Sequence, residues 1–106
     1  MDFIPKKIVN FNAKLLFDSN TTSGIVESLS KDSLYLRAVP FKASPDFPPG
    51  KLVDIKIQPD SGKVICLSCK VVWSYKTPPH GLTNSMGMEI IRPLQSYEEF
   101  YNNLSV

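Results

Sequence analysis

Hydrophobic residues recur at every second position along two stretches in the middle of this sequence. In Leu52–Gln58 the apolar residues alternate with Asp54 and Lys56, and in Lys63–Tyr75 they recur at every odd position from Ile65, with Ser68, Lys70 and Ser74 among the residues between them. A period of two places alternate side chains on opposite faces of a β-strand. The residues between the stretches, Pro-Asp-Ser-Gly at 59–62, have the composition of a turn that ends on glycine. The spacing therefore predicts two strands joined by a tight turn.

The longer stretch also decides how the two cysteines are interpreted. Cys66 and Cys69 form a C-x-x-C pattern, but residues three apart in a strand point to opposite faces and lie about 10 Å apart. A disulfide requires Cα atoms within about 7 Å. Structural zinc requires four ligands, whereas the sequence has a single histidine, His80. We expect both cysteines to be free thiols in a reducing compartment and predict no metal site.

One face of the longer stretch is expected to point into the core. The residues on it are Ile65, Leu67, Cys69, Val71, Trp73 and Tyr75. Trp73 is accordingly interpreted as a residue of the core or its rim, with contact to a ligand or a partner as the open alternative.

Four further strands are predicted from the same kind of pattern. They are Ala13–Phe17, Ile25–Leu29, Leu34–Ala38 and Met86–Ile91. The second and third of these form a hairpin across a polar turn. Turn-forming residues fill positions 18–24, and a loop with four prolines occupies 40–50, where proline excludes a central strand.

Near the end of the chain the period changes to that of an amphipathic helix. Its apolar stripe consists of Tyr97, Phe100, Tyr101 and Leu104. Ser96 and Glu99, three residues apart, are expected to form a capping box at the start of this helix. So short a helix requires packing of its stripe against the sheet.

Six short strands with regular turns, followed by one helix, favour a mainly β fold, a six-stranded antiparallel barrel, because closure removes exposed strand edges. At 106 residues the chain is expected to be one domain, with an N-terminal segment at 1–11, the barrel at 12–92 and the helix at 96–104. The net charge of +2 is weak evidence for a polyanionic partner. No apolar window is long enough for a signal peptide or a membrane span, so we expect a cytoplasmic protein without membrane insertion.

Four short segments occur in a particular order along this chain, before the acidic and aromatic helix. They are Leu34-Tyr35-Leu36-Arg37 after the polar turn, Pro49-Gly50-Lys51-Leu52-Val53, Val71-Val72-Trp73 and Met86-Gly87-Met88-Glu89-Ile90. Their order and spacing resemble the PilZ domain family from about Asn12 to Leu104. The resemblance implies a six-stranded barrel with a C-terminal helix, acting in bacterial cyclic di-GMP signalling.

Family members that bind cyclic di-GMP use two motifs, and this sequence departs from both. The first is an N-terminal Arg-x-x-x-Arg segment, but here Lys6 and Lys7 are the nearest cations and no arginine precedes position 37. The second is an Asp/Asn-x-Ser-x-x-Gly turn. The resemblance places Ser28, Ser30 and Ser33 at its key positions, where only Ser30 matches. Two missing charge-assisted hydrogen bonds would cost about 3 to 6 kcal/mol of binding free energy.

We therefore expect a stand-alone, degenerate PilZ-like module that acts mainly through an unidentified protein partner, with weak or no binding of cyclic di-GMP. Phe41 and Phe47, in the proline-rich loop, are the candidates for contact with that partner. The alternative is a genuine cyclic di-GMP receptor, in which the three serines supply hydroxyls and Lys6, Lys7 or Arg37 supplies charge. On the plainer interpretation the serines satisfy turn backbone groups, the lysines are solvated and Arg37 is a surface residue.

Two other classes of function are less well supported by the sequence. A barrel that binds single-stranded nucleic acid needs aromatic rings interleaved with basic residues, and the predicted strands provide no such platform. An enzyme needs a catalytic constellation, but the chain has one histidine, no nucleophile motif and no acidic pair on a shared strand face. We expect no nucleic-acid partner, no catalysis and no cofactor.

Overall fold

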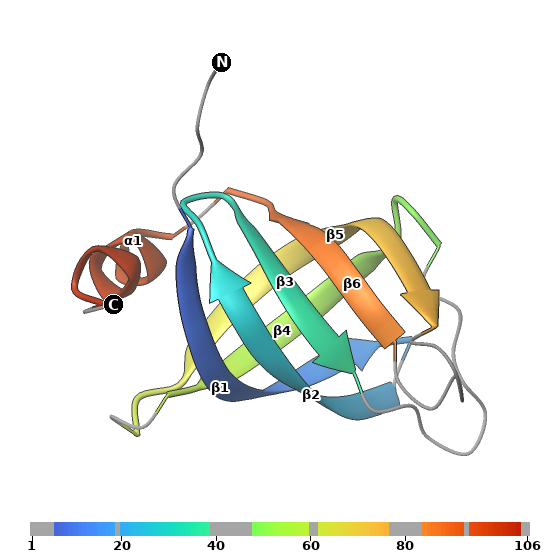
Figure 1. Ribbon diagram of the computed structural model, residues 1–106, viewed down its shortest axis with the longest axis horizontal. Helices are drawn as coiled ribbons and strands as arrows, with labels where there is room; N and C mark the ends of the chain where they lie inside the picture. Colours follow the sequence, from blue (N-terminus) through green and yellow to red (C-terminus); the bar gives the residue numbers. More distant parts are fainter. Residues whose placement is uncertain are drawn as a thin grey trace.

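The computed structural model describes residues 6–18, 20–38, 48–59, 62–76, 84–92 and 94–104 of the chain. Within these residues, six antiparallel strands close into a barrel and one helix follows (Figure 1). The elements are β1 (Lys7–Phe17), β2 (Asn20–Leu29), β3 (Ser33–Ala38), β4 (Leu52–Gln58), β5 (Ile65–Lys76), β6 (Asn84–Ile90) and α1 (Gln95–Asn102). This architecture confirms the predicted mainly β barrel with a C-terminal helix.

Each strand of the barrel is hydrogen-bonded to two others. The order is β1-β2-β3-β6-β5-β4, and β4 returns to pair with β1, from Asn12 opposite Gln58 to Leu16 opposite Asp54. Closure pairs every strand on both sides over its central part, although β1 before Asn12 and β5 after Val71 extend beyond their pairing with β4. Alternation then sends every second side chain inward over most of each strand. The largest fully buried side chains include Leu15, Leu29, Leu36, Ile55, Ile57, Met86 and Met88.

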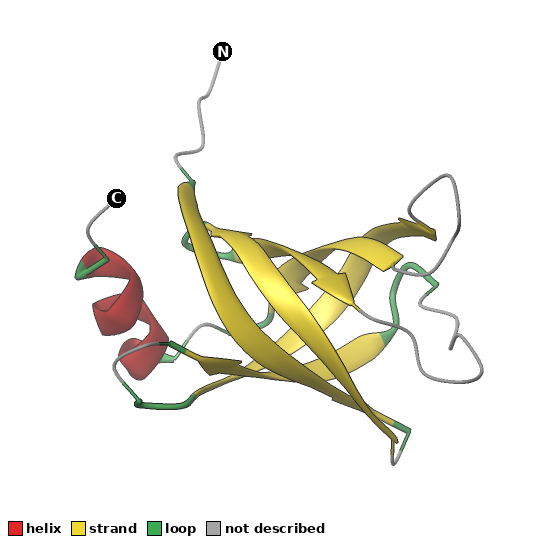
Figure 2. Cartoon of the chain, turned by 60° about the horizontal axis from the view of Figure 1, so that its bottom comes forward, coloured by secondary structure: helices red, strands yellow, loops and turns green. Residues whose placement is uncertain are grey.

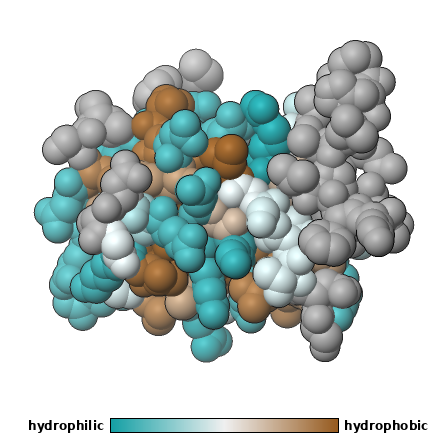
Figure 3. All heavy atoms as spheres, turned by 90° about the horizontal axis from the view of Figure 1, so that it is seen from below, coloured by the Kyte–Doolittle hydropathy of each residue, from teal (hydrophilic) through white to brown (hydrophobic). Residues whose placement is uncertain are grey.

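The surface of the described residues is mixed in polarity. Seen from below, hydrophilic side chains lie interspersed with smaller hydrophobic areas (Figure 3), as is ordinary for a protein surface in contact with water. The described part of the chain contains no helix with the length and apolar character needed to cross a lipid bilayer.

The first two strands extend further than their local composition predicts. β1 begins at Lys7 rather than at Ala13, so it includes part of the segment expected to precede the barrel. β2 begins at Asn20, so the turn-forming composition of 18–24 lies mostly within a strand. The chain reverses near Asp18, whose φ of 45° is left-handed, a conformation that aspartate tolerates better than most residues. Pairing with β1 outweighs the low strand propensity of the serine, asparagine and glycine here.

The predicted core face of β5 is correct for its first half and wrong for its second. The residues predicted to point inward are buried as far as Val71, whereas Trp73 is 39% exposed and Tyr75 is 54% exposed. Val71 lies opposite Met88 in β6. Trp73 lies two positions after Val71 in β5, but its partner Gly87 is only one position from Met88 in β6. This β-bulge adds one residue to β5 and turns the later side chains to the other face.

The helix α1 lies at one end of the barrel (Figure 2), and its apolar stripe packs against the core formed by the strands, as predicted. Tyr97 and Tyr101 are buried, and Phe100 is partly buried with its ring centroid 5.8 Å from that of Phe11 in β1. Leu104, just after the helix, is also partly buried against the core. A helix of eight residues is thus stabilised by tertiary packing.

The start of α1 differs from the prediction. The helix begins at Gln95, with Leu94 as its N-cap residue and no side-chain hydrogen bond at the cap. Ser96 therefore lies inside the first turn, where its hydroxyl cannot act as the N-cap acceptor. The predicted capping box with Glu99 is wrong. Glu99 Oε1 instead accepts a 3.1 Å hydrogen bond from Gln95 Nε2, one turn earlier.

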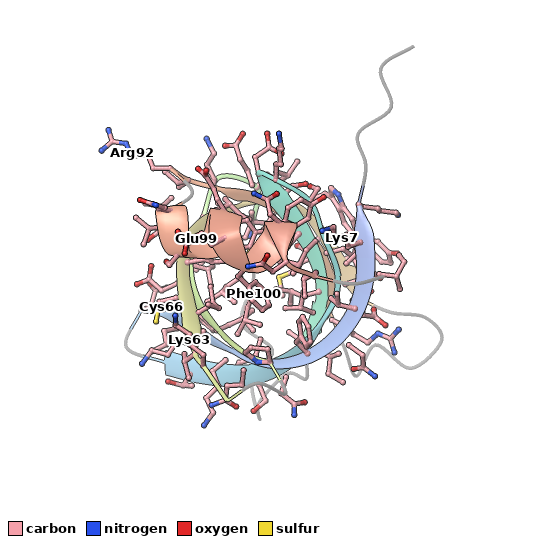
Figure 4. All side chains as sticks on the ribbon, turned by 90° about the vertical axis from the view of Figure 1, so that its left-hand side faces the viewer. Lys7, Lys63, Cys66, Arg92, Glu99 and Phe100 are labelled. Carbon is pink, nitrogen blue, oxygen red and sulfur yellow. The ribbon has the colours of Figure 1, made fainter. Side chains whose placement is uncertain are left out.

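Lys7, at the start of β1, binds the C-terminal end of α1. Figure 4 shows this lysine beside the helix. Its Nζ donates a 2.6 Å hydrogen bond to the carbonyl oxygen of Tyr101 and a 3.2 Å bond to that of Leu104. The ammonium nitrogen also lies 4.5 Å from the centroid of the Tyr101 ring. The last carbonyls of a helix lack intrahelical partners and carry partial negative charge. Lys7 thus supplies the positive charge that the last turn of α1 itself lacks.

The two cysteines lie on opposite faces of β5 and are free thiols, as predicted, with Cys66 exposed and Cys69 buried. Burial, together with the nearby carboxylate of Asp54, raises the pKa of Cys69 to about 12. Within the described ranges, no three His, Cys, Asp or Glu side chains gather closely enough to hold a metal ion.

Candidate binding groove at the serine turn

An open groove of about 600 Å³ lies on the outside of the barrel beside the connection between β2 and β3. We call residues 28–33 the serine turn and this hollow the serine groove. The residues that line it are Lys6, Ile8, Glu27, Ser28, Leu29, Ser30, Ser33, Leu34, Tyr35, Val72, Trp73, Gly87 and Met88. Apart from Lys6 and Ser30, which lie just outside the strands, they come from β1, β2, β3, β6 and β5, which are successive neighbours around the barrel.

A second bulge shapes the serine turn. Val26 of β2 lies opposite Leu36 of β3. Ser28, two positions further along, lies opposite Tyr35, so Glu27 is the extra residue of β2. Ser28 is 8% exposed and lines the groove. The bulge therefore places a small polar residue on the groove side of the strand end.

Ser30 and Ser33 hold the turn together. The Ser30 backbone N–H donates a 2.9 Å hydrogen bond to the Ser33 carbonyl oxygen. The Ser30 hydroxyl lies 3.3 Å from the same oxygen and also contacts the Ser33 hydroxyl. On the other side, the hydroxyl of Tyr97 in α1 donates to the Ser30 carbonyl oxygen. These contacts favour the plainer interpretation of Ser30 and Ser33, because both hydroxyls already take part in the turn.

Of the cations proposed for ligand binding, the structure brings Lys6 to the groove and leaves two outside its lining. Lys7 is bound to the end of α1. Arg37 Nη2 lies 3.2 Å from Glu27 Oε1 and 3.1 Å from Glu27 Oε2, and of this pair it is Glu27 that lines the groove. The charged side chains among the described lining residues are therefore one lysine and one glutamate.

The aromatic residues predicted to contact a partner, Phe41 and Phe47, lie outside the described residues. Three other aromatic side chains stand together beside the groove. The ring centroid of Trp73 lies 5.6 Å from that of Tyr35 and 5.5 Å from that of Tyr75, with interplanar angles of 38° and 16°. We call these three residues the aromatic row. The row was not predicted from the sequence, because uninterrupted alternation along β5 places Trp73 and Tyr75 on its core face.

Gly87 leaves the space in which the Trp73 indole lies. A Cβ atom at position 87 would come within 2.2 Å of Trp73 Nε1 and 2.5 Å of its Cε2, far inside van der Waals contact. The indole can therefore lie across β6 only where that strand has no side chain. A glycine inside a strand indicates a bulge or a close approach, so Gly87 is the sequence signal that could have revealed the position of Trp73.

No family model and no curated protein matches this chain. Solved structures that share its fold include the Bacillus subtilis inhibitor of motility, MotI/DgrA, with a TM-score of 0.70 at 10% sequence identity over 91% of this chain and 44% of that one. The Borreliella burgdorferi PlzA protein, solved in complex with c-di-GMP, gives a TM-score of 0.57 at 15% identity, over 90% of this chain and 47% of that one.

The chain spans less than half the length of either of these proteins. At such low identities the likeness concerns the fold, and the fold agrees with the resemblance found in the sequence. This chain thus has the same fold as these two solved structures.

Proposed function

We propose that this chain is a cytoplasmic PilZ-like regulatory module of bacterial cyclic di-GMP signalling that acts mainly by contact with a protein partner and binds the dinucleotide weakly or not at all. Its similarity in fold to PlzA, solved with c-di-GMP, and to the motility inhibitor MotI/DgrA supports a place in this signalling system. A module of this kind works by binding rather than by catalysis.

The observation that carries the proposal is the charge of the serine groove. Among its described lining residues, Lys6 is the one cation and Glu27 the one anion, and the Glu27 carboxylate is already paired with Arg37. Cyclic di-GMP carries two phosphate groups, which arginine forks bind best. Arg37 is paired with Glu27 and does not line the groove, and the Ser30 and Ser33 hydroxyls contact each other. The described groove thus offers a dianionic ligand one lysine in place of a pair of arginine forks.

Calorimetric titration with cyclic di-GMP tests the proposal. We expect no heat of binding, or a Kd weaker than about 10 μM. A Kd below about 1 μM, which corresponds to more than about 8 kcal/mol, would refute it. Glu27→Gln is the informative variant, because it removes the groove carboxylate. If charge limits binding, this variant binds the dinucleotide several-fold more tightly than the parent chain.

A genuine cyclic di-GMP receptor is the second candidate, and one observation favours it. Ser28, Ser30 and Ser33 line the same groove as Lys6, although the lysine lies more than 20 positions earlier in the chain. A receptor of this kind would use serine hydroxyls and the lysine ammonium in place of the arginine forks.

A substitution series separates the two candidates. If the receptor hypothesis is right, Ser30→Ala and Lys6→Ala each weaken binding of cyclic di-GMP. Lys7→Ala is the matched control for Lys6, because Lys7 contacts α1 instead of lining the groove. A parent chain that shows no measurable binding ends the receptor hypothesis.

A further inference from the structure

We propose that the aromatic row docks an extended, proline-rich segment of a partner protein that carries a basic residue and is bound in the polyproline II conformation. This inference rests on the proposed function, because it names the kind of partner that such a protein-binding module takes.

The aromatic row belongs to an exposed apolar surface. Trp73 and Tyr75 are 39% and 54% exposed, and the nearby Val72 and Ile8 are exposed by more than half. Val72 and Ile8 line the serine groove together with Trp73. Large apolar side chains gathered on one side of a domain mark interaction sites, and aromatic residues supply many of the strongest contacts in protein interfaces.

Three other ways of recognising a peptide fit this surface poorly. An added β-strand needs a free sheet edge, whereas the central part of the groove lies over β2, β3 and β6, each of which is paired with a neighbouring strand on both sides. A phosphorylated segment needs a cluster of arginines, whereas Arg37 is paired with Glu27. An amphipathic helix needs a long apolar groove, and here the groove is interrupted by the hydroxyls of the serine turn.

A proline-rich segment matches the surface in shape and chemistry. Its pyrrolidine rings pack on flat aromatic faces, and its carbonyl groups, which lack internal hydrogen bonds, accept from donors such as the hydroxyls of Tyr35 and Tyr75. Ring spacings of 5.6 and 5.5 Å make the row comparable in length with one polyproline II turn of about 9 Å. The conformation is preformed, so little ordering entropy is lost on binding.

Charge complementarity indicates the basic residue. Glu27 lines the groove beside the row, and its carboxylate is paired with Arg37; the two side chains are 34% and 49% exposed, respectively. Exposed ion pairs of this kind contribute little to stability. A basic side chain of the partner can therefore replace Arg37 at Glu27.

The test uses the full chain and a fluorescein-labelled peptide, Arg followed by seven prolines, with fluorescence anisotropy as the measurement. We expect a saturable rise in anisotropy. Trp73→Ala weakens binding about tenfold or more, and Trp73→Phe retains most of it. Leu94→Ala is the matched control, an exposed apolar residue outside the groove, and leaves binding unchanged. Tyr75→Ala provides a second variant should Trp73→Ala fail to fold.

The charge contact has its own pair of variants. Arg37→Gln releases the Glu27 carboxylate and is expected to strengthen binding of the arginine peptide several-fold. Glu27→Gln is expected to abolish the preference for this peptide over one in which alanine replaces the arginine. If both variants bind the two peptides as the parent chain does, Glu27 is not the partner of the basic residue and the inference is wrong on that point.

The absence of saturable binding up to about 1 mM peptide, or equal losses for Trp73→Ala and Leu94→Ala, overturns the inference. A concentration-dependent dimer that Trp73→Ala abolishes, without peptide binding, assigns the row to a second copy and overturns it equally. Both results are distinguishable from failure of the proposed function, which would show as tight binding of cyclic di-GMP.

Discussion

The hydroxyl of Tyr97 in α1 donates a 2.5 Å hydrogen bond to the carbonyl oxygen of Ser30 in the serine turn, 67 residues earlier in the chain. Tyr97 is fully buried, and Ser30 is 4% exposed. The bond therefore lies away from water, where an unpaired carbonyl is costly. It joins the C-terminal helix directly to the turn that borders the groove.

Tyr97→Phe is expected to destabilise the protein, because it leaves the Ser30 carbonyl without its buried donor. The expected loss is about 1 to 3 kcal/mol of unfolding free energy, measured by urea denaturation. Tyr75→Phe is the matched control, since this exposed tyrosine has more than half of its surface in water, and it should change stability by less than about 0.5 kcal/mol. Equal effects of the two variants would contradict this role of the Tyr97 hydroxyl.

Stability is expected to fall as the pH rises above about 9. Burial is the largest cause that raises the pKa of Cys69, to about 12, and it also raises the pKa of Tyr97. Both groups therefore keep their protons in the folded chain at pH values where the unfolded chain releases them. Their contribution is complete below the unfolded pKa and is lost as the pH rises through the folded one.

Between pH 8 and pH 10 the Cys69 thiol should account for a loss of about 1 to 2 kcal/mol. Urea denaturation at the two pH values measures it, and Cys69→Ala should show a smaller difference between them than the parent chain. A pH dependence that is identical in the variant would mean that another group causes the decline.

The sequence alone predicts most of the fold because strand periodicity is a local property. The alternation along Leu52–Gln58 and the helical stripe of Tyr97 and Tyr101 each follow from neighbouring residues, and the structure bears them out. The bulges do not follow from neighbouring residues. The one after Val71 arises from the pairing of β5 with β6, and it decides whether Trp73 lies in the core or on the surface.

Only the local part of the candidate site could be predicted from the sequence. The serine turn is a local feature of one hairpin, so its position could be inferred from its flanking strands. The other contributions depend on which strands become neighbours around the barrel. No local pattern indicates that Lys6 lines the groove while Lys7 binds the end of α1, or that Glu27 and Trp73 line the same groove.

Gly87→Ala is expected to displace the Trp73 indole, because a methyl group at position 87 overlaps its ring. Trp73 is the single tryptophan of the chain, so its fluorescence reports this site without interference. We expect a red shift of emission and a loss of about 1 to 3 kcal/mol in stability. Val64→Ala, an exposed substitution outside the groove, should leave the spectrum unchanged. An unaltered spectrum for Gly87→Ala would show that the indole does not depend on this space.

One thiol per chain is expected to react with Ellman's reagent under native conditions. Cys66 is exposed, whereas Cys69 is buried and its raised pKa keeps it in the unreactive thiol form. Absorbance should therefore show one fast equivalent, with a second only after unfolding in denaturant. Cys66→Ser should abolish the fast phase and keep the slow one. Two fast equivalents in the native parent chain would mean that β5 is not protected by the barrel.

Lys7→Met is expected to loosen the attachment of α1 while it keeps the aliphatic part of the side chain. The variant removes the donor to the carbonyl oxygens of Tyr101 and Leu104 and the charge at the C-terminal end of the helix. We expect a loss of about 0.5 to 2 kcal/mol in urea denaturation.

Lys6→Met is the matched control for Lys7→Met, because the adjacent Lys6 is exposed and lines the serine groove. It should change stability by less than about 0.5 kcal/mol. Hydrogen exchange of the α1 amides gives a second measurement, which should accelerate in Lys7→Met alone, because only that variant loses a contact to the helix. If both variants behave alike, the two lysines are equivalent solvated residues, and the assignment of Lys6 to the groove and Lys7 to the helix end is wrong.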